Sequence, residues 1–595
     1  MTLVALALVI GSSWAVGGWA LFRVTWPALR RFESIALTLT AGLGLIALLL
    51  SVLALCGWFA YATPVLLALS AAAAVRVVRD VRAAPARRAA QASGSHPRTA
   101  WDQALWAAIV MSAGLACLGA IAPVTDDDAL AFVIPSARHI AQTGALRVWS
   151  DQARAMFPQS QHVLLAYVMR VGGDRLGAVT ALQWLLTIGV VSALARRVCE
   201  RSEHVGAALV IALGAPVAAF QVASAKEDLL MLSAAAACAF CLAGDGSLAE
   251  LGAAGLFAGL AAGAKYPGLG IAVAAVAWTG LSRRGDRWRS AAVVAVCAAA
   301  AGGFWYALNI WRFANPVAPF VFGAAGTHFD AALADAFNDG AGAGRGVVAF
   351  FVTPLRIFAE PSLYCGRGNL YNPLAYAGLA GVFLASARRR SGALFFIAAV
   401  LYVGWFFNLQ NARLLLPAAV LLAPAAADRL MPVIMSDRRA RAWRALGVLA
   451  VAASLGIVAA VGVVRAVRYL RDPAIYLARE TQHYDDIAWM NQHLDPARHR
   501  VGTTFKVIGY LTIPSLVLDP TRQLEIGPAD LATPDRLLAA CRRQGITHLF
   551  GAPDDFDTLR AHLRLLHANP ASRLGGVRFF REPPAEATSV FEIIP

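Results

Sequence analysis

Apolar runs about 20 residues long, the length that a membrane-spanning helix needs, recur along this chain of 595 residues. About fourteen such runs can be marked. They lie at 3–22, 34–57, 60–78, 102–121, 177–195, 204–222, 228–243, 249–264, 267–282, 289–310, 371–386, 391–407, 413–429 and 444–466. The sequence therefore predicts an α-helical polytopic membrane protein. Its short pair 249–264 and 267–282 would form either two spans or one broken re-entrant element.

The charge content supports this class of protein. Charged residues make up 15% of the sequence, whereas soluble globular proteins carry about 25%. The 58% hydrophobic content excludes a disordered chain. The formal net charge is nevertheless +16, with basic residues gathered in loops such as RVVRDVRAAPARRAAQASGSHPR and ASARRRS. Because positive loops stay on the cytoplasmic side of a membrane, this excess signals topology and not nucleic-acid binding.

The same rule predicts which parts of the chain lie outside. With about fourteen crossings, every basic loop lies inside, and residues 467–595 lie outside. This last segment contains no spanning run. YDDIAWMNQHL predicts an amphipathic helix, RVGTTFKVIGYL a strand and turn, PDRLLAACRRQGITHLFGAP a helix and a buried strand, and SVFEIIP a further strand. We therefore expect a membrane domain over 1–466 and a small extracytoplasmic α/β domain over 467–595.

Three consecutive aspartates, Asp126, Asp127 and Asp128, follow the predicted helix 102–121 on the outer side. They precede an amphipathic stretch that Gly144 would end. Adjacent carboxylates repel one another, which favours a raised pKa for at least one, and a carboxylate here can act as a general base toward an acceptor hydroxyl. Alternatively, Asp128 caps the following helix while its neighbours are solvated. The residues alone leave both interpretations open.

Lysine is rare in this chain, where Lys226, Lys265 and Lys506 stand among 52 basic residues. Lys265 lies between two apolar halves, where a charge usually faces a cavity or a partner. We interpret it as an anion-binding residue, for example for a phosphate, with snorkelling to the interface as the alternative. Arg413 begins a helix on the outer side, and its guanidinium suits phosphate, although arginine is too common here to be a signal by itself.

Lys226 is followed by Glu227 and Asp228, and this acidic pair opens the predicted helix 228–243. Acids suit a helix N-terminus, where the helix dipole is positive. For Glu227 and Asp228 we therefore expect helix capping and charge pairing, and no functional role.

Five segments, taken in order, resemble a known family. They are VTDDDALAFVIPSARHIAQTGAL, MFPQSQHVLLAYVMRVGGDRLGAVTALQW, GLAAGAKYPGL, FWYALNIWRFANPVAPF and QNARLLLPA, within roughly residues 102–430. The resemblance is to the GT-C superfamily of membrane glycosyltransferases. Asp128 stands at the acidic position of its first outer loop, Phe132 and Pro135 match an aromatic residue and a proline, and Val133 replaces a frequent histidine.

The resemblance implies transfer of a sugar from a polyprenyl-phosphate donor to an acceptor at the outer face of the bacterial inner membrane, usually with inversion. Asp128 would be the general base, with Asp127 as the second choice. Lys265 and Arg413 would bind the carrier phosphate and stabilise the leaving group. The implied partners are the lipid-linked donor, a glycan, lipid or protein acceptor of the cell envelope, and membrane lipids. No cofactor is implied, although Asp126, Asp127 and Asp128 would allow a divalent metal.

A transporter or flippase of a lipid-linked or small substrate is the main alternative. An intramembrane lysine and an arginine at a helix end would suit it. Against it, the sequence shows no obvious internal repeat between its halves, and the acids cluster outside. A noncatalytic membrane scaffold ranks last, because it gives no role to Lys265 or to the aspartates.

Overall fold

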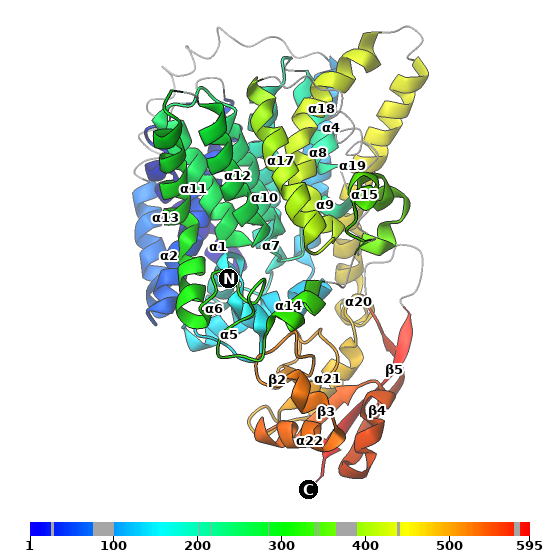
Figure 1. Cartoon of the computed structure of the whole chain (residues 1–595). Helices are drawn as coiled ribbons and strands as arrows, with labels where there is room; N and C mark the ends of the chain where they lie inside the picture. Colours follow the sequence, from blue (N-terminus) through cyan, green and yellow to red (C-terminus); the bar gives the residue numbers. More distant parts are fainter. Residues whose placement is uncertain are drawn as a thin grey trace.

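The computed structural model describes residues 1–24, 26, 29–74, 100–201, 203–214, 216–283, 285–338, 342, 344–364, 389–436, 441–575 and 584–594. A bundle of helices carries a small sheet domain at one end (Figure 1). The end of the bundle beside the sheet domain is the domain-facing end.

Seven of the described helical segments are long and apolar enough to cross a membrane. They are α1 (Thr2–Ala20), α2 (Arg31–Leu55), α4 (Ala100–Cys117) with η2 (Leu118–Ile121), α7 (Gly177–Val198), α13 (Arg287–Phe313), η6 (Ala412–Leu415) with α18 (Leu416–Ser436), and α19 (Arg441–Arg471). Shorter apolar helices lie among them. These include α8 (His204–Leu213), α10 (Asp228–Leu242), α11 (Leu248–Ala264), α12 (Pro267–Ser282), α15 (Val347–Ala359) and α17 (Arg389–Phe407). The chain is thus an integral membrane protein, and its mainly helical class is confirmed.

The predicted count of about fourteen segments is not confirmed. The run 204–222 is not one helix, because α8 ends at Leu213 and a separate short helix, α9, covers Pro216–Ala219. A proline lacks the N–H that a continuous helix needs, which explains the break at Pro216. α11 and α12 are two separate helices, and α19 continues to Arg471, past the expected end at 466. The predicted run 371–386 and the end of 60–78 lie outside the described residues.

α1 and α2 pack so closely that their contact requires glycine. A Cβ atom built on Gly42 of α2 would lie 1.8 Å from the backbone oxygen of Ser13 on α1. A Cβ atom on Gly17 of α1 would lie 2.0 Å from the backbone oxygen of Thr38. Both distances are far below van der Waals contact, so the two helices can approach only where these positions lack a side chain.

Gly42→Ala is expected to destabilise the folded protein, because α1 and α2 must move apart. Overpacking of this kind costs about 1–3 kcal/mol. A thermal melt of the purified protein in detergent measures the loss as a lower Tm. The matched control is Gly114→Ala in α4, where an added Cβ meets nothing within 4 Å. A Tm for Gly42→Ala equal to that of the control would contradict the close packing.

The C-terminal domain is built on a five-stranded sheet with the strand order β2-β1-β3-β5-β4. β1 pairs in parallel with β2 and β3, whereas β5 pairs antiparallel with β3 and β4. The strands are β1 (Val501–Thr503), β2 (Ser515–Val517), β3 (His548–Gly551), β4 (Leu563–Arg573) and β5 (Ala585–Ile593); the helices include α20 (Pro473–Glu480), α21 (Tyr484–His493) and α22 (Pro534–Arg543). A small sheet domain was expected here. β4 was not predicted, because it contains Pro570, and a proline usually argues against a strand. β4 is an edge strand, and Pro570 lies where its pairing with β5 is irregular, a place where proline is tolerated.

The C-terminal domain lies against α5 (Ile134–Thr143) and α14 (Ala331–Asn338) at the domain-facing end, which also holds α6 (Ser160–Arg170) (Figure 1). Tyr510 Oη donates to the carbonyl oxygen of Val124 at 2.7 Å. Arg500 Nη2 lies 2.6 Å from Asp151 Oδ1, and the N–H of Ala153 donates to the carbonyl of Arg522 at 2.7 Å. These bonds fix the sheet domain beside the segment that carries the three aspartates.

Candidate functional site

The three aspartates form a turn between η2 and a π-helical segment, η3 (Ala129–Val133), which continues into α5. Asp126 Oδ1 accepts a hydrogen bond from the N–H of Ala129 at 3.0 Å. Asp128 makes no capping bond, so the suggestion that Asp128 caps the helix is wrong and Asp126 has that role. Gly144 ends α5 with a positive φ of 67°, as expected. Short π-helical segments occur frequently at functional sites.

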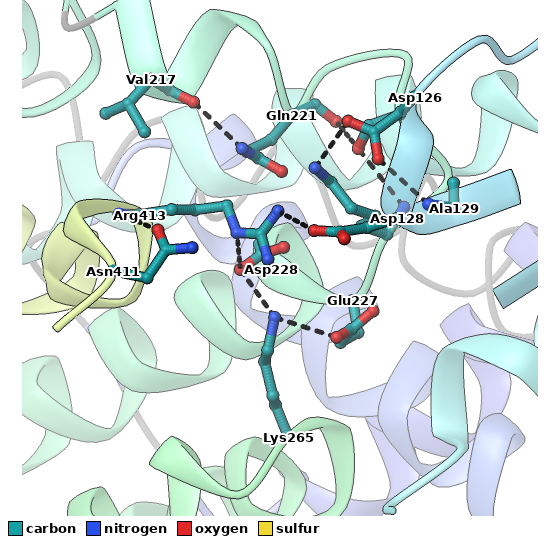
Figure 2. A network of polar contacts seen from close by, with 12 residues as sticks. Asp126, Asp128, Ala129, Val217, Gln221, Glu227, Asp228, Lys265, Asn411 and Arg413 are labelled. Atoms are coloured by element: carbon teal, nitrogen blue, oxygen red, sulfur yellow. Dashed lines mark hydrogen bonds and ion pairs between the residues drawn. The ribbon is translucent and has the colours of Figure 1, made fainter. Parts of the chain in front are cut away.

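Asp126 and Asp128 are each paired with a different cation. Lys226 Nζ lies 2.7 Å from Asp126 Oδ2, and the lysine side chain is only 4% exposed. Arg413 Nη1 lies 2.8 Å from Asp128 Oδ2. Figure 2 shows Arg413 and Asp128 facing each other from different segments of the chain. Because a buried charge is strongly unfavourable without a partner, these pairs hold the aspartate turn in place.

Lys265 stands at the junction of α11 and α12. Pro267 begins α12, so the chain leaves the helix at Lys265, whose backbone is extended. Its Nζ lies 2.9 Å from Glu227 Oε1 and 3.0 Å from Asp228 Oδ1 (Figure 2). Lys265 is therefore a largely buried, paired cation, and its ammonium group contacts these two acids instead of snorkelling to the interface.

The acids that open α10 do not cap it. Glu227 occupies the N-cap position without a side-chain capping bond, so the expectation of capping is wrong. The expected charge pairing is confirmed, but the partner Lys265 comes from another helix junction. Glu227 and Asp228 thus belong to the same site as Lys265, a role that the sequence did not predict.

Arg413 connects the aspartate turn to α10. Asn411 orients its backbone by accepting a hydrogen bond from the N–H of Arg413 at 3.1 Å. Its Nη1 contacts Asp128, while its Nε lies 3.8 Å from Asp228 Oδ1. This Nε is buried and makes no hydrogen bond among the described residues, because Asp228 is too far away for one. The structure therefore places the predicted residues Asp128, Lys265 and Arg413 in one cluster.

Asp127 differs from its two neighbours. It is partly buried and makes no hydrogen bond or ion pair within the described ranges. Burial raises the pKa of Asp127 to about 6; Lys506 opposes this shift, and the charges of Asp126 and Asp128 add to it. Burial also acts on Asp128, but Arg413 and other nearby cations outweigh it and hold the pKa of Asp128 well below its ordinary value.

Lys506 is a further residue of the site that the sequence did not assign. It lies on the segment 504–511 of the C-terminal domain, which packs against η3. A Cβ atom on Gly509 would lie 2.8 Å from the Cα atom of Leu130, and Arg138 of α5 donates to the carbonyl of Leu511 at 3.1 Å. The scarcity of lysine marks Lys506 in the sequence, but only the folded chain shows that its charge acts on Asp127.

The acidic residues are not grouped as a metal site. Within the part of the chain that the structure describes, no three His, Cys, Asp or Glu side chains are placed to hold a metal ion. Asp126 and Asp128 contact Lys226 and Arg413 instead. A divalent metal at the aspartates stays a prediction.

Comparisons with known proteins identify the fold. A family model described as the DUF1420 N-terminal domain matches residues 104–243, which include the aspartate turn and the Lys226–Asp228 segment. No curated protein matches the sequence. The structure is similar to ArnT from Cupriavidus metallidurans bound to undecaprenyl phosphate, with a TM-score of 0.52, 16% identity, and coverage of 83% of this chain and 98% of that one.

A second similar structure is the Archaeoglobus fulgidus oligosaccharyltransferase in complex with Zn and sulfate. Its TM-score is 0.51 at 13% identity, and the match covers 75% of this chain and 67% of that one. Both matches extend over most of this chain, so the likeness includes far more than a single helical hairpin. The chain therefore has the fold of the GT-C glycosyltransferases, which confirms the resemblance seen in its sequence motifs.

Proposed function

We propose that this chain is a glycosyltransferase that moves a sugar from a polyprenyl-phosphate donor to an acceptor at the outer face of the bacterial inner membrane. One observation carries the proposal: the unpaired carboxylate of Asp127 adjoins Asp128, which pairs with Arg413 in the same cluster of charges as Lys265. The fold supports it, because the similar ArnT structure holds undecaprenyl phosphate. In this orientation the C-terminal domain is extracytoplasmic.

Lys265 and Arg413 would bind the donor phosphate. The buried Arg413 Nε has no hydrogen-bond partner in the described structure, and a buried donor without an acceptor is rare in proteins. A phosphate oxygen would satisfy it, and the guanidinium geometry suits that contact. Charge that develops on the leaving phosphate would be stabilised by both cations, which are already fixed by Asp128, Glu227 and Asp228.

Asp127 is the better candidate for the general base. The sequence ranked Asp128 first, but the ion pair with Arg413 stabilises its ionised form and makes it a weak base. The raised pKa of Asp127 lies nearer to the operating pH, where base catalysis is most efficient. Asp127 would accept the acceptor hydroxyl proton while the new bond forms at the anomeric carbon. The bond from that carbon to the phosphate oxygen breaks, and inversion follows from attack on the opposite face.

Lys506→Met is expected to raise the pKa of Asp127, because Lys506 stabilises the ionised carboxylate. The base works only when deprotonated, so the rising limb of kcat/KM against pH would move to higher pH. A pH series of the transfer rate measures the shift. Arg536→Met, on the exposed side of α22, is the matched control and should leave the limb in place. An unchanged limb in Lys506→Met would contradict the electrostatic contact.

The function is tested in proteoliposomes that contain the purified chain and a polyprenyl-phosphate donor with a radiolabelled sugar. With cell-envelope extract as the acceptor source, label should move covalently into another molecule, which mass spectrometry of envelope glycans then identifies. If labelled donor crosses the bilayer and no label is transferred, the transporter alternative holds. Because protein cations would hold the phosphate, we propose that transfer needs no metal; loss with EDTA and recovery with Mg²⁺ would contradict this part.

A further inference from the structure

A cavity of about 720 Å³ lies between the domain-facing end of the bundle and the C-terminal domain. Val124 and Ile134 line it from the two sides of the aspartate turn, and Tyr510 lines it from the C-terminal domain. Its size is within the range of roughly 300–1,000 Å³ typical of small-molecule sites. The cavity thus borders the segment that carries Asp127 but is lined by other residues than the proposed phosphate site.

The charged lining of this cavity is mainly basic. Arg138, Arg170 and Arg175 line it, and Asp174 is the acidic residue that accompanies them. The formal sum of these four groups is +2 (three positive charges and one negative). Arginine is common in this chain, so a single arginine beside a cavity is weak evidence for an anionic ligand. Three guanidinium groups that converge on one cavity from α5, from the end of α6 and from the following loop are a stronger indication of an anionic ligand.

The three arginines retain free hydrogen-bonding capacity. Arg138 donates to the carbonyls of Gly509 and Leu511. Arg170 Nη1 donates to the carbonyl of Ala141 at 3.0 Å. Arg175 Nη2 donates to Tyr469 Oη at 2.8 Å, and its Nε lies 3.6 Å from Asp174 Oδ2. A guanidinium carries five N–H donors, so these contacts leave most donors of each group available. Arg138 also holds the two domains together, whereas Arg170 is exposed and better suited to a ligand.

We propose that this cavity binds a phosphate group of the acceptor and so places an acceptor hydroxyl beside the aspartate turn. The inference rests on the proposed function. Arginine forks bind phosphate oxygens in pairs, which gives orientation as well as affinity. The acceptor would thus be a phosphorylated glycan or glycolipid headgroup, held by Arg170 and Arg175 from one side while Tyr510 closes the other.

The test measures binding without any donor or transfer. The full chain is placed in phosphatidylcholine nanodiscs and titrated calorimetrically with glucose 6-phosphate, with unphosphorylated glucose as the ligand control. The wild type should bind only the phosphorylated sugar. Arg170→Gln/Arg175→Gln should weaken this binding by about tenfold or more, and Arg170→Gln alone by less. Arg498→Gln, at a side chain 81% exposed in the C-terminal domain, is the control and should bind as the wild type does.

Two results would overturn the proposal. The first is equal affinity of the wild type and the double variant for glucose 6-phosphate, including the case in which neither binds. The second is that phosphatidylglycerol nanodiscs compete with glucose 6-phosphate for the wild type but not for the double variant. This result would assign the cavity to a membrane lipid. No sugar is transferred in this binding experiment, so its result is independent of the transfer assay. If glucose 6-phosphate binds through the arginines but the chain transfers no sugar, the proposed function is wrong and the anion site is still supported.

Discussion

Asp127→Asn is expected to lower the rate of sugar transfer about 10²–10⁴-fold, the usual contribution of a general base. The variant should still insert and fold, because Asp127 makes no ion pair or hydrogen bond in the described structure. In the wild type, kcat/KM should rise with pH through about 6, as Asp127 loses its proton. Asp127→Asn should lose this limb of the pH profile together with the rate.

Two further variants make this result specific. Asp557→Asn removes an exposed ion pair of the C-terminal domain and should retain the wild-type rate and pH profile. Asp128→Asn should also slow transfer, because Arg413 loses its nearer carboxylate and keeps only the more distant Asp228, but the rise of kcat/KM near pH 6 should remain. The opposite pattern, in which Asp127→Asn stays active and Asp128→Asn loses the limb, would assign the base to Asp128.

The sequence predicted the membrane class and most helices because apolar runs are a local property. It predicted less well where a helix end depends on one residue, as at Pro216, or where a strand has no apolar alternation, as in β4. The exposed edge strand β4 contains polar residues and a proline, which together remove the period-2 pattern on which strand prediction depends.

The site residues were predicted in part for a similar reason. Lys265 and the aspartates stand out as charges beside apolar runs, and burial of such charges implies partners. The sequence does not say which partners. Lys226 lies 100 residues from Asp126, and Arg413 lies 285 residues from Asp128. For Glu227 and Asp228, helix capping explained the acidic residues from the local sequence alone. Their contact with Lys265 joins two helix junctions, and the local sequence does not predict it.

Lys265→Ala is expected to lose transfer activity and stability together. Its removal leaves Glu227 without its cation and Asp228 with the more distant Arg413, and breaking a buried pair costs about 3–5 kcal/mol. A melt in detergent should show a lower Tm. Loss of activity in this variant alone would not distinguish a phosphate-binding lysine from a structural one, so a second change is needed.

Lys265→Ala/Glu227→Gln separates the two roles. Replacing Glu227 removes the carboxylate that Lys265 neutralised, while Asp228 still has Arg413 at 3.8 Å, so most of the lost stability should return. Transfer should stay about 10²–10³-fold below the wild type, because the leaving phosphate has lost a fixed cation. Glu227→Gln alone keeps Lys265 paired with Asp228 at 3.0 Å and serves as the control for Tm, kcat and the KM of the donor. If the double variant regains activity along with its Tm, Lys265 only balances buried charge, and the donor phosphate binds elsewhere.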